Sequence, residues 1–553
     1  MFWGETTKQT YCAALLVLAS ATTLAGSQAP TDKLDQIVAK YDSKTGPGVE
    51  IFVVQDGKEL YRRTAGMANV EYGIPITKES IFHIASVSKQ FTAFAACLLE
   101  QGGKLNMDDD VRKYLPELPN YGTKITLRNL ATHTSGLRDF YALNAMVGFT
   151  EADVSYNSQI LKLLVQQKKL NFKPGTKFEY GNSSFTLLGE VVSRVAKKPL
   201  REFLNERVFT PLGMNNTQLV DDPELIIPNR AYSYYTQGGV LYKRLLGPVN
   251  VGSTGINSTA DDLVRWSQNF ENPKVGNQRI FQRMSERMKL TDGTQLGYAL
   301  GQEFKNYRGV NVVFHGGGDA GYRSYLIRVP EKKLTVVVLG NSREFFPLDL
   351  AYSALDTFLF NGPAPEKPKP TFDPKLLAKF VGDYEIFPGN IVHLTTEKGK
   401  LYLQPYGDPN KMELPQVGED EFDYPVFTHS RFTFGKSGNF KWQLFDIPYG
   451  GTRINLKPFK PAQANLKELV GTYYSPELRD EYTLSIVKGQ LIAAHRRNED
   501  ITLMPIQRDW YHGSSYFFGK VIPTRDRKGR ISGLRVSTQG ASNILFKRVS
   551  PRS

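Results

Sequence analysis

The sequence predicts an α+β protein, in which an antiparallel sheet flanked by helices is followed by two small antiparallel β-barrels. Three observations lead to this prediction. Strand-like apolar runs lie at both ends of residues 31–360, with helical patterns between them. A proline-rich stretch at 361–374, NGPAPEKPKPTFDP, has the composition of an extended linker. Beyond it, short alternating strands and turn residues dominate, and their pattern occurs twice.

Composition excludes two classes of protein before any motif is considered. Of the 553 residues, 41% are hydrophobic and 22% are charged, so the chain can build several packed domains and is not a disordered protein. The formal net charge is +14, but the basic residues are scattered and form no nucleic-acid-binding signature. We therefore expect no nucleic-acid partner, and a basic surface suited to an anionic envelope or substrate.

The N-terminal residues resemble an export signal. Residues 11–26 form an apolar run that ends in small residues, and this run is too short to span a membrane. We expect a signal peptide at 1–27, no transmembrane anchor, and a periplasmic or secreted bacterial protein. Once the signal is removed Cys97 is the sole cysteine, so no disulfide framework is expected.

The elements of residues 31–360 follow from hydrophobic periodicity. A β-hairpin is predicted around Asp56-Gly57, whose residue types suit a tight turn. Helices are predicted at 34–44, 159–168, 183–197 and 352–360. Strands are predicted at 300–313, 325–330 and 333–340, and the last is nearly all apolar and therefore central.

The two barrels, at 375–460 and 461–553, are predicted from an internal repeat. The sequence VGDY at 381–384 recurs as VGTY at 470–473, and Gly399 in one hairpin matches Gly489 in another. The shift is 89 or 90 residues each time, which indicates a repeated unit. Each unit is long enough for about eight short strands, as in a small antiparallel barrel.

Ser86 and Lys89 are the candidate catalytic pair. Ser86 precedes an apolar helical pattern, and a three-residue spacing places Lys89 one turn later on the same face. A hydroxyl at a helix N-terminus, within reach of an amine that can take its proton, is an activated nucleophile. Alone, this spacing is more typical of a capping serine followed by a surface lysine.

Two further stretches carry polar residues of the right chemistry. Tyr180 and Asn182 lie one residue apart before a helix, so a phenol and a carboxamide can face one cleft, although a half-buried aromatic with a capping asparagine would have the same pattern. His133, in THTSGL, is a candidate general base, but a structural role in its loop fits the pattern better. The stretch His315-Gly-Gly-Gly318 places glycines between apolar strands, which suggests close approach of a ligand to the backbone.

Together, and in this order, the three motifs resemble those of the serine β-lactamase and penicillin-binding-protein family, in its class C-like branch. They stand here as S-V-S-K at 86–89, Y-G-N at 180–182 and H-G-G at 315–317, and THTSGL, PLGMNNT and GSTGINSTADDL support them. The resemblance implies an added helical lobe, with the active site between it and the sheet. It also implies that Ser86 is acylated, that Lys89 and Tyr180 transfer protons, and that Asn182 binds the substrate amide. The backbone N–H groups of Ser86 and Gly318 would hold the oxyanion.

One position departs from the commonest form of the family pattern. His315 stands where many members have a lysine, and a histidine is mostly neutral near pH 7. This version resembles D-aminopeptidases, which carry two C-terminal lipocalin-like barrels. His315, Gly317 and Gly318 are expected to contact the substrate.

The sequence therefore predicts an exported serine hydrolase that forms an acyl-enzyme on a small peptide, amide or ester substrate, such as one derived from the cell wall. A peptidase of D-aminopeptidase or related type fits best. Two alternatives stay open: a β-lactamase or D-Ala-D-Ala carboxypeptidase, and a non-catalytic protein that binds peptidoglycan or β-lactams. No cofactor and no metal site are expected, because the seven histidines are spread out and show no ligand spacing. The sequence leaves the oligomeric state open.

Overall fold

The computed structural model describes residues 31–549, except 151, 363–371, 427–429, 436, 445–446, 458 and 460. The predicted signal peptide, and most of the predicted linker at 361–374, lie outside the described residues. Within the described part of the chain, none of the helices has both the length and the apolar character needed to cross a membrane.

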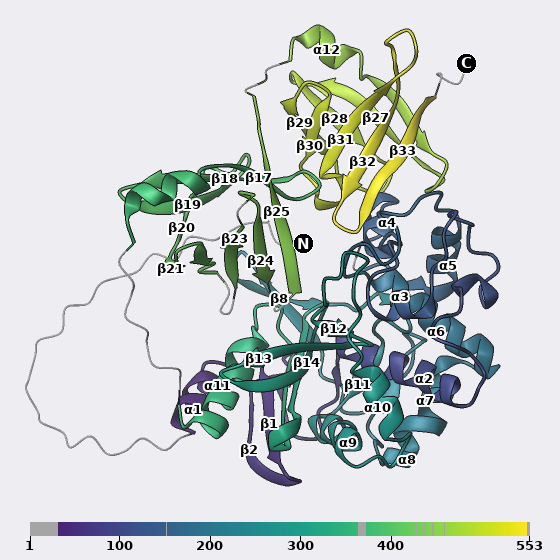
Figure 1. Cartoon of the computed structure of the whole chain (residues 1–553), viewed down its shortest axis with the longest axis vertical. Coiled ribbons are helices and arrows are strands. Elements are labelled where there is room, and N and C mark those ends of the chain that lie inside the picture. Colours follow the sequence, from purple (N-terminus) through teal and green to yellow (C-terminus); the bar gives the residue numbers. More distant parts are fainter. Residues whose placement is uncertain are drawn as a thin grey trace, which may run out of the picture.

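A seven-stranded antiparallel sheet is the centre of the first domain (Figure 1). Its strand order is β12-β13-β14-β15-β16-β1-β2, so the first two strands of the domain lie at one edge of the sheet, next to β16. The strands are β1 (Val49–Gln55), β2 (Lys58–Ala65), β12 (Tyr298–Ala299), β13 (Gln302–Tyr307), β14 (Val310–Asp319), β15 (Tyr322–Val329) and β16 (Leu334–Gly340). The turn between β1 and β2 is at Asp56-Gly57, both with positive φ, as the sequence predicted.

Both faces of this sheet are covered by helices. Strand β16 is buried along its whole length, with Val336 and Val338 in one apolar cluster and Val337 and Leu339 in another. On the first face α1 (Asp32–Ala39) and α11 (Pro347–Phe360) pack together, and on the second face lies α9 (Ala260–Glu271). Burial on both faces explains the continuous apolar sequence of β16, and the prediction of a central strand is confirmed.

A helical lobe packs beside the second face of the sheet. Its helices are α2 (Lys89–Gln101), α3 (Leu127–Ala131), α4 (Phe140–Met146), α5 (Asn157–Val165), α6 (Asn182–Ala196), α7 (Leu200–Leu204) and α8 (Thr210–Leu212). α2 is almost wholly buried, and its Phe91 and Phe94 contact Trp266 of α9. Cys97 lies on the same helix, and burial raises the pKa of its thiol to about 12, so the thiol stays protonated and inert.

Smaller elements connect the sheet and the lobe. They are β3 (Met67–Asn69), β4 (Ile74–Pro75), β5 (Phe82–His83), β6 (Ser155–Tyr156), β7 (Gln218–Leu219), β8 (Ser233–Gln237), β9 (Val240–Arg244), β10 (Pro248–Val249), β11 (Ile256–Ser258) and α10 (Gln278–Met284).

The predicted helix at Ser86 and the predicted strand at 300–313 differ from the structure in kind, and other predicted elements, such as the helices at 34–44 and 352–360, differ only in where they begin or end. The helix expected to begin at Ser86 begins as a short 3₁₀ helix, η1 (Ala85–Ser88), and becomes α-helical at Lys89. The strand expected at 300–313 is wrong, because Arg308 and Gly309 both adopt positive φ and form a hairpin turn between β13 and β14. The apolar residues on both sides of this turn hid it in the sequence.

Two β-structures follow the first domain. In the described residues, the first is a nine-stranded sheet that nearly closes, of β17 (Gly382–Phe387), β18 (Asn390–Glu397), β19 (Lys400–Pro405), β20 (Met412–Leu414), β21 (Gln416–Gly418), β22 (Glu421–Asp423), β23 (Arg431–Phe434), β24 (Phe440–Leu444) and β25 (Ile447–Ile454). The second is a closed eight-stranded barrel, of β26 (Gly471–Ser475), β27 (Asp480–Val487), β28 (Gln490–Ala494), β29 (Ile501–Gln507), β30 (Trp510–Gly513), β31 (Lys520–Arg525), β32 (Ile531–Thr538) and β33 (Ala541–Val549). A short helix, α12 (Gln463–Lys467), lies between them.

The sequence repeat has the same structure in both copies. The Tyr384 hydroxyl donates to the Phe380 carbonyl at 2.9 Å, and the Tyr473 hydroxyl donates to the Leu469 carbonyl at 2.8 Å. In both, the tyrosine lies four residues after its acceptor and ties the first strand to the preceding turn. The same tyrosine hydrogen bond therefore occurs at the start of both β-structures.

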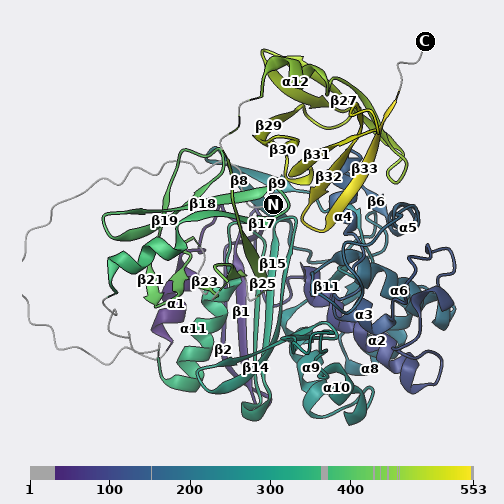
Figure 2. The same cartoon turned by 45° about the horizontal axis from the view of Figure 1, so that its top comes forward.

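The second barrel packs on the helical lobe, next to α4, as two views show (Figures 1 and 2). Apolar side chains of the barrel and of the lobe belong to one buried cluster, which includes Met146 and Phe546. The Tyr482 hydroxyl donates to the Met146 carbonyl at 2.8 Å. Arg138 and Glu477 form a buried ion pair across the interface, with 2.7 Å between Nη1 and Oε2. Such a pair is strongly destabilising to break, so it fixes how the barrel sits on the lobe.

Candidate active site

The candidate nucleophile lies in a strained turn. Ala85 is fully buried and has φ of +47°, which is unusual for a residue with a side chain. The Ser324 hydroxyl of β15 donates to the Ile84 carbonyl at 2.7 Å and holds this turn against the sheet. Ser86 follows in η1 and is partly exposed. The turn thus keeps Ser86 partly accessible on a rigid support.

Lys89 has no exposed surface, and three oxygens surround its amine. Its Nζ atom lies 2.9 Å from Ser86 Oγ, 3.0 Å from Asn182 Oδ1 and 2.9 Å from the carbonyl oxygen of Ser253. The amide oxygen of Asn182 and the carbonyl oxygen of Ser253 can only accept, whereas the serine hydroxyl can also donate. A neutral amine would therefore donate to Asn182 and Ser253 and direct its lone pair at the Ser86 hydroxyl.

Burial favours this neutral form. It lowers the pKa of Lys89 to about 7, although the carboxyl groups of Asp139 and Asp319 oppose the shift. Near neutral pH a large fraction of the amine can thus take a proton from Ser86. This is the chemistry expected of a general base beside a serine nucleophile.

Burial determines the protonation state of Tyr180. An ammonium at Lys89 would have lowered the pKa of the phenol, but burial raises the pKa of Tyr180 above its ordinary value. The phenol also hydrogen-bonds Ser86, and the Lys89 amine lies 4.9 Å from the centre of its ring. In this structure Tyr180 is a neutral hydroxyl beside the nucleophile, which can relay a proton but does not act as a phenolate.

Asn182 is the first residue of α6, and its side chain points at Lys89. Its backbone N–H donates to the carboxyl Oδ2 atom of Asp139. The residue is therefore held from both sides, with its amide oxygen on the Lys89 amine. This position agrees with the predicted role in binding a substrate amide, which stays a prediction.

His315 belongs to a hydrogen-bonded chain that fixes its tautomer. Its Nδ1–H donates to the Gly316 carbonyl at 2.6 Å, so Nε2 accepts from the Tyr298 hydroxyl at 3.1 Å. The Tyr298 oxygen accepts from His133 Nε2–H at 3.1 Å, and His133 Nδ1 accepts from the Gly181 N–H at 3.2 Å. Every donor in this chain has one acceptor.

Both histidines of this hydrogen-bonded series, His133 and His315, are neutral. Burial lowers the pKa of His315 to about 3, and it moves the pKa of His133 far below its ordinary value. His315 is 2% exposed, and both of its ring nitrogens have protein partners. The predicted contact of His315 with substrate stays a prediction, but the ring offers neither a positive charge nor a free N–H. His133 has the structural role that the sequence favoured.

Gly317 and Gly318 place β14 next to the nucleophile turn. A Cβ atom on Gly317 would lie 2.5 Å from the Ile84 carbonyl oxygen and 2.3 Å from Ser324 Oγ, so this position accepts only glycine. Gly318 is exposed at the same end of the strand. The strand thus approaches the turn closely enough for its backbone to serve the site, and the oxyanion role of the Ser86 and Gly318 N–H groups stays a prediction.

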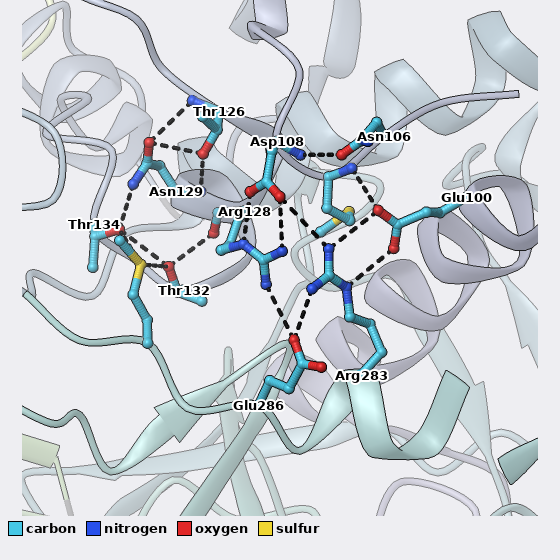
Figure 3. A network of polar contacts seen from close by, with 12 residues as sticks. Glu100, Asn106, Asp108, Thr126, Arg128, Asn129, Thr132, Thr134, Arg283 and Glu286 are labelled. Carbon is cyan, nitrogen blue, oxygen red and sulfur yellow. Dashed lines mark hydrogen bonds and ion pairs between the residues drawn. The ribbon is translucent and has the colours of Figure 1, made fainter. Parts of the chain in front are cut away.

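The THTSGL loop is braced from the side of the lobe (Figure 3). Thr134 accepts from the Asn129 side chain at 3.0 Å and exchanges a 3.1 Å hydrogen bond with Thr132. His133, between the two threonines, adopts a positive φ of 55°. Ion pairs between Arg128 and Asp108 extend the same network along the lobe. These contacts hold the His133 ring where it can support Tyr298 and Gly181.

Comparison with known proteins identifies the family. The family model described as Beta-lactamase matches residues 34–357. The chain belongs to the beta-lactamase family. It is also similar to a D-aminopeptidase of Brucella anthropi, with 27% identity over 525 residues that cover 91% of this chain and 96% of the relative.

Solved structures agree with this membership. The octameric penicillin-binding protein homologue from Pyrococcus abyssi aligns with a TM-score of 0.57 and 24% identity, over 76% of this chain and all of that chain. A penicillin-binding protein from Bacillus halodurans aligns with a TM-score of 0.51 and 25% identity, over 59% of this chain and 99% of the other. The protein is thus a serine hydrolase related to the β-lactamases.

In this member of the beta-lactamase family, three parts of the site went unnoticed in the sequence. They are the Ser253 carbonyl, the Tyr298 hydroxyl and the Asp139 carboxyl. A backbone carbonyl carries no sequence signal, although Ser253 lies inside the GSTGIN stretch that supported the family resemblance. Tyr298 and Asp139 reach the site only through the fold, because they lie on elements distant from Ser86 in the sequence.

Gly317→Ala tests the close approach of β14 to the nucleophile turn. The added Cβ would displace Ile84 or Ser324, so we expect kcat/KM to fall by roughly 100-fold or more, a loss typical of a site misplaced by about 1 Å. Gly318→Ala is the comparison, because the atoms nearest to a Cβ there belong to Arg323 and lie at 3.5 Å or more. Equal losses in the two variants would show that the packing of Gly317 is not what positions the turn.

The pH dependence of catalysis tests the state of Lys89. If the neutral amine is the base, kcat/KM rises with pH through an acid limb near pH 7, because the pKa of Lys89 is lowered to about 7. Lys89→Arg cannot lose its proton in this range and is expected to be inactive at every pH. A limb near pH 10, the ordinary range of lysine, would show that the amine is not desolvated in the working enzyme.

Proposed function

We propose that this protein cleaves amide bonds that follow an amino-terminal D-amino acid, in small peptides or amides, through an acyl-enzyme on Ser86. The observation that carries the proposal is the neutral, buried His315 in the position where many relatives have a lysine. A fixed cation there would suit the carboxylate of a penicillin or a D-Ala-D-Ala peptide. Its absence removes that attraction.

The charges around the site favour the opposite kind of substrate. Asp139 and Asp319 act on Lys89 electrostatically, and both raise its pKa, so these two carboxyl groups make the potential at the amine more negative. Such a potential attracts a substrate ammonium group and repels a carboxylate. The similarity to a D-aminopeptidase, which covers 91% of this chain, supports the same class of substrate.

The reaction follows from the contacts of the residues. The Ser86 hydroxyl passes its proton to Lys89 Nζ while Oγ attacks the carbonyl carbon, and the amide C–N bond then breaks. The proton moves from Lys89, directly or through the Tyr180 hydroxyl, to the departing amine. Water then adds to the Ser86 ester with the same base and releases the acid. The N–H groups of Ser86 and Gly318 would stabilise the oxyanion in both steps.

Kinetic comparison of substrates tests this proposal. We expect kcat/KM for a D-amino-acid amide to exceed that for nitrocefin by at least roughly tenfold, and both activities to vanish in Ser86→Ala. The corresponding L-amino-acid amide and a short acyl ester are measured with the same preparation. Preference for nitrocefin would favour a β-lactamase, and lack of turnover with every substrate would favour a binding protein.

We also propose that the protein acts in the periplasm or outside a bacterial cell. The apolar run at 11–26, which ends in small residues, supports export. N-terminal sequencing of the protein recovered from its native host should find a mature start close to residue 28. An intact N-terminus in the cytoplasmic fraction would contradict this proposal.

A further inference from the structure

Asp139 lies where the helical lobe, the active site and the second barrel meet. The residue is 8% exposed, and its carboxyl group has two backbone N–H partners on different helices. One carboxyl oxygen accepts from the Tyr141 N–H at 3.0 Å and caps α4. The other accepts from the Asn182 N–H at the start of α6. One carboxyl group therefore aligns the first turns of two helices.

The start of α6 depends on this remote acceptor. The residue before Asn182 is Gly181, which has no side chain to accept from the first N–H groups of the helix. The carboxyl group of Asp139 takes that place, and a negative charge there is also favoured by the helix dipole. Since Asn182 Oδ1 is one of the three oxygens around the Lys89 amine, a shift of Asn182 would alter the geometry of the base.

The other side of Asp139 is held by the second barrel. Its backbone N–H donates to the Gly540 carbonyl at 2.7 Å, in the turn between β32 and β33. Asn171 donates to the same carbonyl at 2.9 Å and accepts from the Ser542 N–H at 2.9 Å. The neighbouring Arg138 donates to the Ser542 carbonyl at 2.9 Å. The barrel turn is thus fastened to the segment that carries Asp139.

We propose that Asp139 is a positioning residue for Asn182 and Lys89, and that the turn at 539–541 of the second barrel holds it in place. The barrel would then be part of the apparatus that activates Ser86, rather than an appended module. This inference rests on the proposed function, in which Ser86 is the nucleophile and Lys89 its base.

Gly540 shows how closely the barrel turn fits. Its φ of +79° suits glycine, and a Cβ atom would lie 2.8 Å from the Cβ of Asp139. Gly529, in another turn of the same barrel, has the same φ of +79°, but a Cβ atom there would have nothing within 4 Å. The two glycines thus share the backbone requirement and differ only in contact with Asp139.

The charge of Asp139 gives its role a signature that a purely structural residue would lack. Among the groups that raise the pKa of Lys89, Asp139 acts more strongly than Asp319. The other titratable groups that face the amine are His133, His315 and Tyr180. Removing the negative charge while keeping the shape of the side chain should therefore lower the pKa of Lys89 and move the acid limb of reactivity to lower pH.

The experiment measures how fast a fluorophosphonate labels Ser86 across pH, in the full chain. Asp139→Asn should label roughly 5- to 100-fold more slowly on the plateau, because a buried N–H loses its acceptor, and its acid limb should lie at lower pH than in the wild type. Asp153→Asn is the matched control. Asp153 also contacts the second barrel, through a 2.7 Å hydrogen bond from Arg497, but it does not act on Lys89.

A second pair of variants keeps every charge. Gly540→Ala should label more slowly than Gly529→Ala, with an acid limb that moves less than in Asp139→Asn. If Asp139→Asn does not fold, this pair decides alone, and equal rates overturn the proposal. For a folded Asp139→Asn, labelling like that of Asp153→Asn, or slower labelling with an unmoved limb, also overturns it. If the wild-type protein does not label at Ser86, the proposed function itself is refuted. If the wild type does label, the results for the variants test only the positioning role of Asp139.

Discussion

A lysine amine without exposed surface is the constraint on which the rest of the site depends. A buried ammonium is costly, so the amine of Lys89 needs hydrogen-bond partners in every direction and loses its proton near neutral pH. The partners come from three separate parts of the chain: the nucleophile turn, the start of α6, and the loop that carries Ser253. The fold of the first domain can be understood as the means of bringing these parts to one atom.

Burial also determines the protonation states of the other titratable side chains near Lys89. Burial keeps His315 and His133 neutral and Tyr180 protonated, so none of these three side chains adds a charge next to Lys89. Proton transfer can then proceed between neutral partners, and the carboxyl groups of Asp139 and Asp319 make the potential at the Lys89 amine more negative. The proposed substrate selectivity and the basicity of Lys89 thus have one physical origin, which is the desolvation of the side chains around Ser86.

Much of this site could be predicted from the sequence, because local spacing carries its main contacts. The three-residue gap places Lys89 against Ser86, and the crowding around Gly317 agrees with glycines that let β14 approach the turn. Burial could not be predicted in the same way. The sequence does not show how far the phenol of Tyr180 is desolvated, and this desolvation keeps the phenol protonated. Asp139 and Tyr298 were missed because their roles exist only once distant segments, including the second barrel, have packed together.

Direct titration of the Lys89 amine tests the central claim most closely. In protein carrying ¹³C- and ¹⁵N-labelled lysine, NMR follows the side-chain signals across pH, and the signal lost in Lys89→Arg identifies this residue. The account predicts one lysine that loses its proton near pH 7, while the exposed lysines titrate in their ordinary range near pH 10.4. A Lys89 that stays charged up to pH 9 or above would contradict it, because the amine could not then accept the Ser86 proton at neutral pH.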